Sequence, residues 1–143
     1  MPGPAVVTAG VIMRLARDVR TALDQRFAAY DLTSQQAAVL IHVYAGEVSP
    51  RRIGELLGTD TAGMSRLLDR LESKGLIRRA ADPGDRRAIV VSLTDRGASL
   101  IPQLPPLFEV VGSELASGLT EDEVEATLRV LQSMLHNLHG EGA

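Results

Sequence analysis

The first thirty residues carry the spacing of an amphipathic helix. Apolar side chains recur every four positions along one side of this segment, at Val11, Leu15, Val19, Leu23 and Phe27. Charged side chains fill the opposite side, so the segment has one face for packing and one for water. The pattern predicts one long helix over residues 6–30, which ends at the pair Asp31-Leu32.

N-cap signals predict three further helices in the middle of the chain. Thr33 and Gln36 form a capping-box pattern. Ser49 precedes a proline at a first helical position, and Asp60 can cap the helix after it. Glycines mark the expected ends of these three helices: Gly46, Gly58 and Gly75.

Two β-compatible runs follow, over residues 76–82 and 87–93, and the sequence Pro-Gly-Asp joins them. Such turn residues between two runs of this kind predict a hairpin. Thr94 can then cap a long segment in which Pro102 and the pair Pro105-Pro106 are expected to kink or interrupt the helix.

A second capping box, formed by Thr120 and Glu123, opens the last predicted helix. Apolar residues follow it at a/d-like spacing: Val124, Leu128, Leu131, Leu135 and Leu138. An isolated chain would expose this stripe, and large exposed apolar patches usually mark an interface.

The predicted order is four helices, a hairpin and two more helices, with no internal repeat or linker. We therefore expect a mainly α fold with a small β hairpin, in one domain of residues 1–143. Two short helices over residues 49–58 and 60–75, followed by the hairpin, have the layout of a helix-turn-helix with a wing.

The second helix of that pair has two different faces. Its apolar side chains fall on one side: Met64, Leu67, Leu68 and Leu71. Small, polar and charged side chains fall on the other: Thr61, Ala62, Ser65, Arg66, Asp69 and Arg70. Small residues permit a close approach to base edges, and Arg66 can reach a guanine or a phosphate. The alternative is a plain amphipathic helix with a solvated polar face.

Arginines cluster on the predicted hairpin: Arg78, Arg79, Arg86 and Arg87. A hairpin can follow the minor groove of DNA, whose negative potential attracts arginine. The alternative is that these charges serve solubility alone. Their place beside a helix-turn-helix pattern favours DNA binding.

The net charge of −3 is unevenly distributed. Residues 49–97 hold ten Lys/Arg and seven Asp/Glu, whereas the rest of the chain holds five and eleven. The middle is therefore basic and the ends acidic, as expected for one basic face on an acidic body. There are no cysteines, which excludes disulfides and thiolate metal sites.

We expect a cytoplasmic protein that is not an enzyme and needs no cofactor. No apolar run approaches the roughly 20 residues of a membrane span, and no basic segment precedes the first apolar run as in a signal peptide. No nucleophile elbow or phosphate-binding glycine loop is present.

His136 and His139 have a possible metal-ligand spacing. Cations near a helix C-terminus also suit the helix dipole, and we expect no metal site.

The segment "TAGMSRLLDRLESKGLIRRAADPGDRRAIVVSLTDRG" resembles the MarR family of winged helix-turn-helix regulators. The resemblance implies an obligate homodimer that binds a pseudo-palindromic operator. Dimerisation helices would span residues 6–30 and 98–139, and a winged lobe would span 33–97. The implied DNA-binding residues are Arg51, Arg52, Thr61, Ala62, Ser65, Arg66, Arg70, Asp85, Arg86 and Arg87.

The resemblance also suggests individual roles. Asp85 would hold the wing arginine Arg87 in place. Gly63 stands where relatives usually carry a bulkier residue, and a glycine within a helix costs about 1 kcal/mol relative to alanine. This raises the question of how rigid the start of the reading helix is.

The family implies a repressor that a small molecule, of an aromatic or phenolic kind, releases from DNA. The candidate pocket residues are Arg20, Tyr30, His42 and Tyr44, for which ordinary packing is the alternative. The alternative function for the whole chain is a winged-helix module that contacts other proteins and does not bind DNA selectively.

Overall fold

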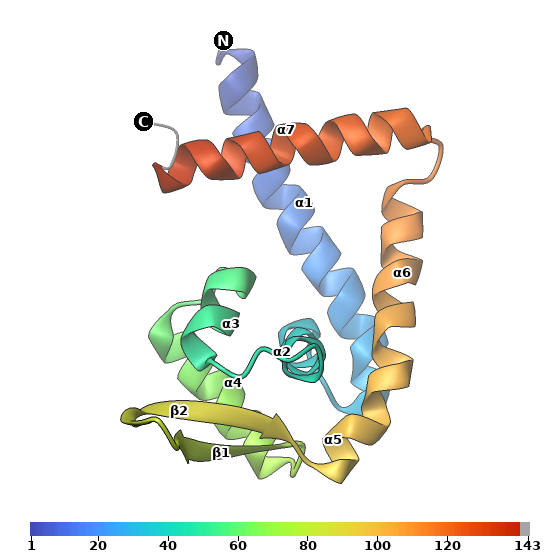
Figure 1. The fold of residues 1–143 in the computed structure, drawn as a ribbon. Helices are drawn as coiled ribbons and strands as arrows, with labels where there is room; N and C mark the ends of the chain where they lie inside the picture. The colour runs from blue at the N-terminus through green and yellow to red at the C-terminus, as the bar shows by residue number, and fades with distance from the viewer. Residues whose placement is uncertain (141–143) are drawn as a thin grey trace. The chain divides into compact units, whose positions relative to one another are not determined.

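The computed structural model describes residues 1–140. Figure 1 shows a chain of helices with one two-stranded antiparallel hairpin, which confirms the predicted fold class. The chain divides into two compact units, one of residues 1–109 and one that begins at Val110. The elements are α1 (Pro4–Phe27), η1 (Ala28–Tyr30), α2 (Ser34–Tyr44), α3 (Pro50–Leu57), α4 (Thr61–Ser73), β1 (Ile77–Asp82), β2 (Asp85–Leu93), α5 (Asp95–Leu100), η2 (Ile101–Gln103), α6 (Leu104–Leu115) and α7 (Glu121–His139).

Side-chain caps start the helices where the sequence predicts them. At α2, the Thr33 hydroxyl accepts a hydrogen bond from the backbone N–H of Gln36, and the Gln36 side chain accepts one from the backbone of Thr33. Thr120 and Glu123 form the same reciprocal pair at α7. Single caps open α3, α4 and α5: Ser49, Asp60 and Thr94. Each cap satisfies backbone donors that a helix start leaves free.

The first helix ends earlier than the sequence predicts. α1 stops at Phe27, and residues 28–30 form the 3₁₀ turn η1. Asp31 then adopts a left-handed conformation with φ of 55°, which aspartate tolerates better than most residues. The prediction of one helix over residues 6–30 is therefore wrong at its C-terminal end, because the chain tightens into a 3₁₀ turn before α2.

The prolines after the hairpin act in two ways. Pro102 lies in the 3₁₀ turn η2 and separates α5 from α6, as predicted. Pro105 and Pro106 lie in the first turn of α6 and do not interrupt a helix. A proline is tolerated there because the first N–H groups of a helix have no partner within it.

The hairpin joins β1 and β2 through a two-residue loop. Ile77 pairs with Leu93 at its base and Asp82 pairs with Asp85 at its tip, on either side of Pro83 and Gly84. The second strand begins two residues earlier than predicted. Along the edge of β2 that does not face β1, the backbone N–H of Val91 donates a hydrogen bond to the carbonyl of Val48. This bond connects β2 to the segment before α3.

The core of residues 1–109 is built from aliphatic side chains and one aromatic pair. The rings of Phe27 and Phe108 lie 4.9 Å apart between centroids, at a tilted angle that aromatic pairs favour. The largest fully buried side chains are Phe27, Leu40, Ile53, Leu71, Ile77, Leu104, Val39 and Val91. The predicted apolar face of α4 is confirmed, because all four of its members are buried: Met64, Leu67, Leu68 and Leu71.

Two helices keep apolar side chains in solvent. In α1, Val7, Val11 and Leu15 are exposed, and Phe27 is the buried residue of the helix. In α7, Leu128 and Leu135 are 55% and 57% exposed, and no residue of that helix is buried in the single chain. The N-terminal part of the α1 stripe and most of the α7 stripe are therefore uncovered in a single chain, whereas the C-terminal part of the α1 stripe packs on the core. Within residues 1–140, none of the helices is long and apolar enough to cross a membrane.

Candidate nucleic-acid interface

Two glycines set the geometry of the α3–α4 pair. A Cβ atom on Gly54 would lie 2.9 Å from Cγ of Met64 and 3.1 Å from the carbonyl oxygen of Thr59. The two helices therefore cross at a distance that excludes a larger residue. Gly58 ends α3 in a left-handed conformation with φ of 66°, which glycine adopts at no steric cost.

The start of α4 explains why residue 63 is a glycine. The carboxylate of Asp60 accepts a hydrogen bond of 2.7 Å from the backbone N–H of Gly63. A Cβ atom at position 63 would lie 2.6 Å from Cγ2 of Thr59 and 3.1 Å from that same carboxylate. The side chains of the turn occupy the space that a larger residue needs.

The outward face of α4 is fully open to solvent. The side chains proposed to meet DNA from this helix are all exposed: Thr61, Ala62, Ser65, Arg66 and Arg70. Within the described part of the chain, Arg66 and Arg70 have no ion pair. Their charges are therefore not neutralised within the protomer.

The two arginines of α3 are differently placed. Arg51 and Arg52 both pair with Glu55, at 3.5 and 3.3 Å, across one turn of the helix. These pairs are largely exposed, and exposed ion pairs are worth 1 kcal/mol or less, roughly. Both arginines therefore remain available to an external anion at small cost.

The tip of the hairpin carries the predicted wing residues. Asp85, Arg86 and Arg87 are exposed. The Asp85 carboxylate accepts a 3.0 Å hydrogen bond from the backbone N–H of Arg87. Asp82 makes the equivalent bond to the backbone of Gly84, at 2.9 Å. Asp85 thus fixes the backbone of Arg87 and leaves its guanidinium without a partner among residues 1–140.

Arg79 does not belong to the exposed basic cluster that the sequence predicts. Its guanidinium lies 2.7 Å from the Asp69 carboxylate and 3.2 Å from that of Glu72, both on α4. The Arg79 guanidinium lowers the pKa of Glu72, mainly through their side-chain hydrogen bond, and the two carboxylates raise the pKa of Arg79. Arg78 is exposed. The alternation of a strand thus sends neighbouring arginines to opposite sides.

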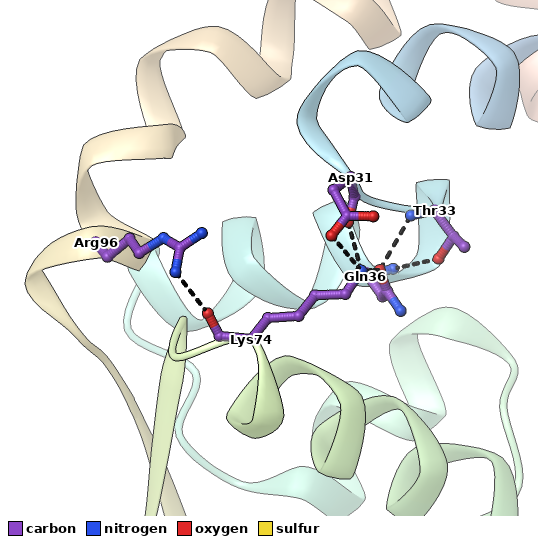
Figure 2. Close-up of polar contacts among 5 residues, drawn as sticks. All are labelled: Asp31, Thr33, Gln36, Lys74 and Arg96. Atoms are coloured by element: carbon purple, nitrogen blue, oxygen red, sulfur yellow. Dashed lines mark hydrogen bonds and ion pairs between the residues drawn. The ribbon is translucent and has the colours of Figure 1, made fainter.

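The C-terminal end of α4 holds a polar cluster that the sequence did not reveal. Figure 2 shows the Lys74 ammonium reaching the corner between η1 and α2, where it contacts the backbone carbonyl of Asp31 and the side chain of Gln36. Arg96 of α5 donates to the carbonyl oxygen of Lys74 at 3.2 Å. The only signal in the sequence is that Lys74 is the sole lysine among fifteen Lys/Arg residues.

The same end of α4 is packed tightly against α5. The Thr94 hydroxyl donates to the carbonyl of Gly75 at 2.6 Å, and the Thr94 backbone N–H donates to the carbonyl of Leu76. A Cβ atom on Gly97 would lie 2.1 Å from that Leu76 carbonyl oxygen. Only glycine fits where α5 meets the strand entry.

Two of the four candidate pocket residues line separate cavities. Arg20 lines a polar cavity of about 470 Å³ between α1, the start of α2 and α4, together with Arg66 and Arg70. Tyr30 lines a separate cavity of about 250 Å³ beside Lys74. His42 is half-buried and Tyr44 is exposed, and neither lines these two cavities.

A larger cavity of about 860 Å³ lies between α3, α4 and the hairpin. Its walls include Met64, Leu68 and Ile89, with Arg79 at one side. Among residues 1–140, no three His, Cys, Asp or Glu side chains are grouped so as to hold a metal ion.

Comparison with known proteins places the chain in a family. The sequence profile of the MarR family matches residues 30–88. An uncharacterised HTH-type transcriptional regulator of Bacillus subtilis, YwaE, is 32% identical over 137 residues, which are 94% of this chain and 80% of YwaE. This chain belongs to the MarR family. It is a member of a family of transcriptional regulators, and its α3–α4 pair and hairpin are the helix-turn-helix and wing of the fold.

Solved MarR-family structures have the same architecture. A MarR variant from E. coli in complex with operator DNA is 28% identical and superimposes with a TM-score of 0.83, over 92% of this chain and 95% of that one. The complex of S. aureus MepR with DNA is 27% identical, also with a TM-score of 0.83, over 90% and 96% of the two chains.

Proposed function

We propose that this MarR-family chain is a sequence-specific DNA-binding regulator that acts as a homodimer. The observation that carries the proposal is a set of exposed arginines without partners in residues 1–140, on α4 and on the wing: Arg66, Arg70, Arg86 and Arg87. α4 would enter the major groove, and the wing would follow the minor groove and the backbone.

The division of labour follows from the chemistry of the two elements. Ser65 and Arg66 lie on the exposed face of a helix whose start is made of small residues, so they can approach base edges. Arg86 and Arg87 lie at the start of β2, next to the two-residue loop, where they can contact phosphates or a narrow groove. Two structural relatives, from E. coli and S. aureus, were solved in complex with DNA, which supports DNA binding by this fold.

The proposed dimer would use the uncovered apolar faces of α1 and α7. Leu128 and Leu135 expose more than half of their surface in a single chain. Burial of apolar surface contributes about 25 cal/mol per Å², so two such helices from each chain are a strong driving force for association. Two lobes in one dimer also double the number of phosphate contacts, which compensates for the weak basic charge of each lobe.

The proposed regulation is release of DNA by a small aromatic acid. Arg20, Arg66 and Arg70 line the cavity of about 470 Å³, which is of the size that binds small ligands. A carboxylate in that cavity would pair with the two α4 arginines that we assign to DNA. Ligand and operator would then compete for the same charges, so that binding of one would exclude the other.

The test of DNA binding is a mobility-shift titration with the DNA upstream of the gene and with unrelated DNA of equal length. We expect selective binding to the upstream DNA. Arg66→Ala should weaken it by about 1–3 kcal/mol and relax the preference at one base pair. Equal affinity for both DNAs would instead support the alternative, a module that contacts proteins.

Benzoate serves as the probe for the ligand, with Arg20→Ala as the cavity variant. Arg20 lies on α1 and is not assigned to DNA, so Arg20→Ala should bind the operator as the wild type does. We expect millimolar benzoate to weaken operator binding by the wild type and to have less effect on Arg20→Ala. An equal response of both proteins would exclude this cavity as the ligand site.

A further inference from the structure

We propose that Lys74 is a positioning residue that fixes the C-terminal end of α4 to the corner between η1 and α2, and so orients the helix that reads DNA. The proposal rests on the DNA-binding function proposed above. It assigns a share in operator recognition to a partly buried contact at the C-terminal end of α4.

The ammonium of Lys74 is surrounded by oxygen atoms of that corner. It donates to the backbone carbonyl of Asp31 and to Oε1 of Gln36, the latter at 3.1 Å, and it lies 3.8 Å from the Asp31 carboxylate. The Lys74 side chain is only 28% exposed. Figure 2 shows the side chain extended across the gap between α4 and the corner.

The acceptors are themselves held in place. Gln36 is 2% exposed, and its Oε1 also accepts the backbone N–H of Thr33 in the capping box of α2. Asp31 is the one residue other than glycine with a positive φ in the described chain, and its N–H is bonded to the carbonyl of Ala28. A cation that binds both oxygens therefore binds a rigid surface.

The backbone of Lys74 is held from the opposite side. Arg96 donates to its carbonyl oxygen, and Thr94 donates to the carbonyl of the next residue, Gly75. Positive groups at the C-terminus of a helix also interact favourably with its dipole. The end of α4 is thus fixed between α5 on one side and the α2 corner on the other.

A small movement at this end has a large effect at the other. α4 has 13 residues, which at 1.5 Å per residue give a helix about 20 Å long. A tilt of about 10° at Lys74 would move Thr61, at the far end, by about 3 Å. Hydrogen bonds to base edges do not survive such a displacement, because their distances vary by only a few tenths of an ångström.

The choice of lysine also fits this role. The chain carries fourteen arginines and this single lysine. An ammonium is compact and its three donors rotate freely, so it can serve a carbonyl, an amide oxygen and a carboxylate grouped around one point. A planar guanidinium is larger and spreads its donors in a fixed fork. A residue needed only for its charge would be replaceable by arginine.

The first experiment compares Lys74→Arg and Lys74→Met with the wild type in binding to operator and to unrelated DNA. We expect both variants to lose operator affinity tenfold or more. Lys74→Arg should bind unrelated DNA within about twofold of the wild type, with an unchanged dependence on salt. Arg129→Met, which removes an exposed charge from α7, is the control and should bind the operator normally.

The Lys74→Arg variant shows whether Lys74 acts by positioning α4 or only through its positive charge. If it binds the operator as tightly as the wild type, Lys74 acts through its charge alone and the proposal is wrong. Thermal unfolding of both variants shows whether each is folded. If Lys74→Met does not fold, the comparison of Lys74→Arg with the wild type still tests the proposal.

A second experiment tests the contact without DNA. Protein labelled with ¹⁵N-lysine contains one side-chain ammonium group, which gives a single signal. Ammonium protons exchange rapidly with water near neutral pH unless they are hydrogen-bonded and shielded. We expect a visible signal in the wild type and its loss in Gln36→Met, which removes one acceptor.

The two experiments distinguish an error in the proposed function from an error in the role of Lys74. A wild type that does not distinguish operator from unrelated DNA would overturn the proposed function, whereas the ammonium signal still decides whether the contact exists. An ammonium that exchanges freely in the folded wild type would overturn the role of Lys74 even if selective DNA binding is found.

Discussion

The guanidinium of Arg79 lies 2.7 Å from the carboxylate of Asp69, so the first strand of the wing is bound to the helix that faces DNA. Glu72, one turn further along α4, contacts the same guanidinium at 3.2 Å and also accepts the backbone N–H of Arg79. The angle between wing and α4 is therefore set by ionic contacts as well as by packing.

The first prediction concerns the pH dependence of this contact. Arg79 lowers the pKa of Glu72 in the folded protein, so the pair stabilises the fold above the ordinary carboxylate pKa. That stability is lost as the pH falls through the lowered pKa. We expect Glu72→Gln to melt below the wild type near neutral pH, and the gap in Tm to close in acid. A gap that stays constant down to about pH 3 would contradict the ionic origin.

The second prediction concerns Gly97. A methyl group at this position would lie 2.1 Å from the Leu76 carbonyl oxygen, so α5 must move away from the strand entry. Gly97→Ala should cost about 1–3 kcal/mol or more in urea unfolding, as overpacked sites do. The control is Gly10→Ala in α1, where no atom lies within 4 Å. It should stabilise the chain by about 0.5–1 kcal/mol.

The third prediction concerns Gly63 and its neighbour Thr59. Gly63→Ala gains helix propensity but brings a Cβ to 2.6 Å from Cγ2 of Thr59, and we expect a net loss of stability. Thr59→Ser removes that methyl group and keeps the hydroxyl. The double variant should therefore be more stable than Gly63→Ala alone, by urea unfolding. Additive effects of the two changes would show that this contact is not the cause.

The fourth prediction separates charge from geometry at the wing. The Asp85 carboxylate holds the backbone N–H of Arg87 at 3.0 Å, and an asparagine oxygen can accept the same bond. Asp85→Asn should therefore keep the turn, lose a negative charge and bind DNA as tightly as the wild type or more tightly. Asp85→Ala should bind more weakly despite the same change in charge. Equal affinities of the two variants would mean that the bond has no role in binding.

The fifth prediction concerns the proposed dimer. Leu128→Glu places a charge on the exposed apolar stripe of α7, where it disturbs no buried contact of the single chain. Sedimentation should show a folded monomer that has lost operator binding. Ser133→Glu, on the opposite side of the helix, is the matched control and should remain dimeric. A monomeric wild type at micromolar concentration would refute the proposed interface.

Local signals predicted most of the fold. Thr33, Ser49, Asp60, Thr94 and Thr120 cap helices as the sequence indicates, because a cap bonds to a backbone group only a few residues away. The two faces of α4 were predictable for the same reason, since helical periodicity determines which side chains share a face.

Contacts between distant residues were not predictable. Lys74 meets Asp31, 43 positions away, and Arg79 meets Asp69 through the packing of a strand on a helix. Neither contact leaves a periodic or capping signal. The sequence likewise does not show which cavities the candidate pocket residues line: Arg20 on α1 and Tyr30 on η1 line different ones.

Because Lys74 is the single lysine, a lysine-specific protease can be used to probe the C-terminal end of α4. An enzyme that cleaves only after lysine has one peptide bond to cut, between Lys74 and Gly75, and would release residues 1–74 and 75–143. The carbonyls on both sides of that bond are held by Arg96 and Thr94, so cleavage must await a local opening. When reclosing is fast, the rate of this single cut reports the free energy of that opening.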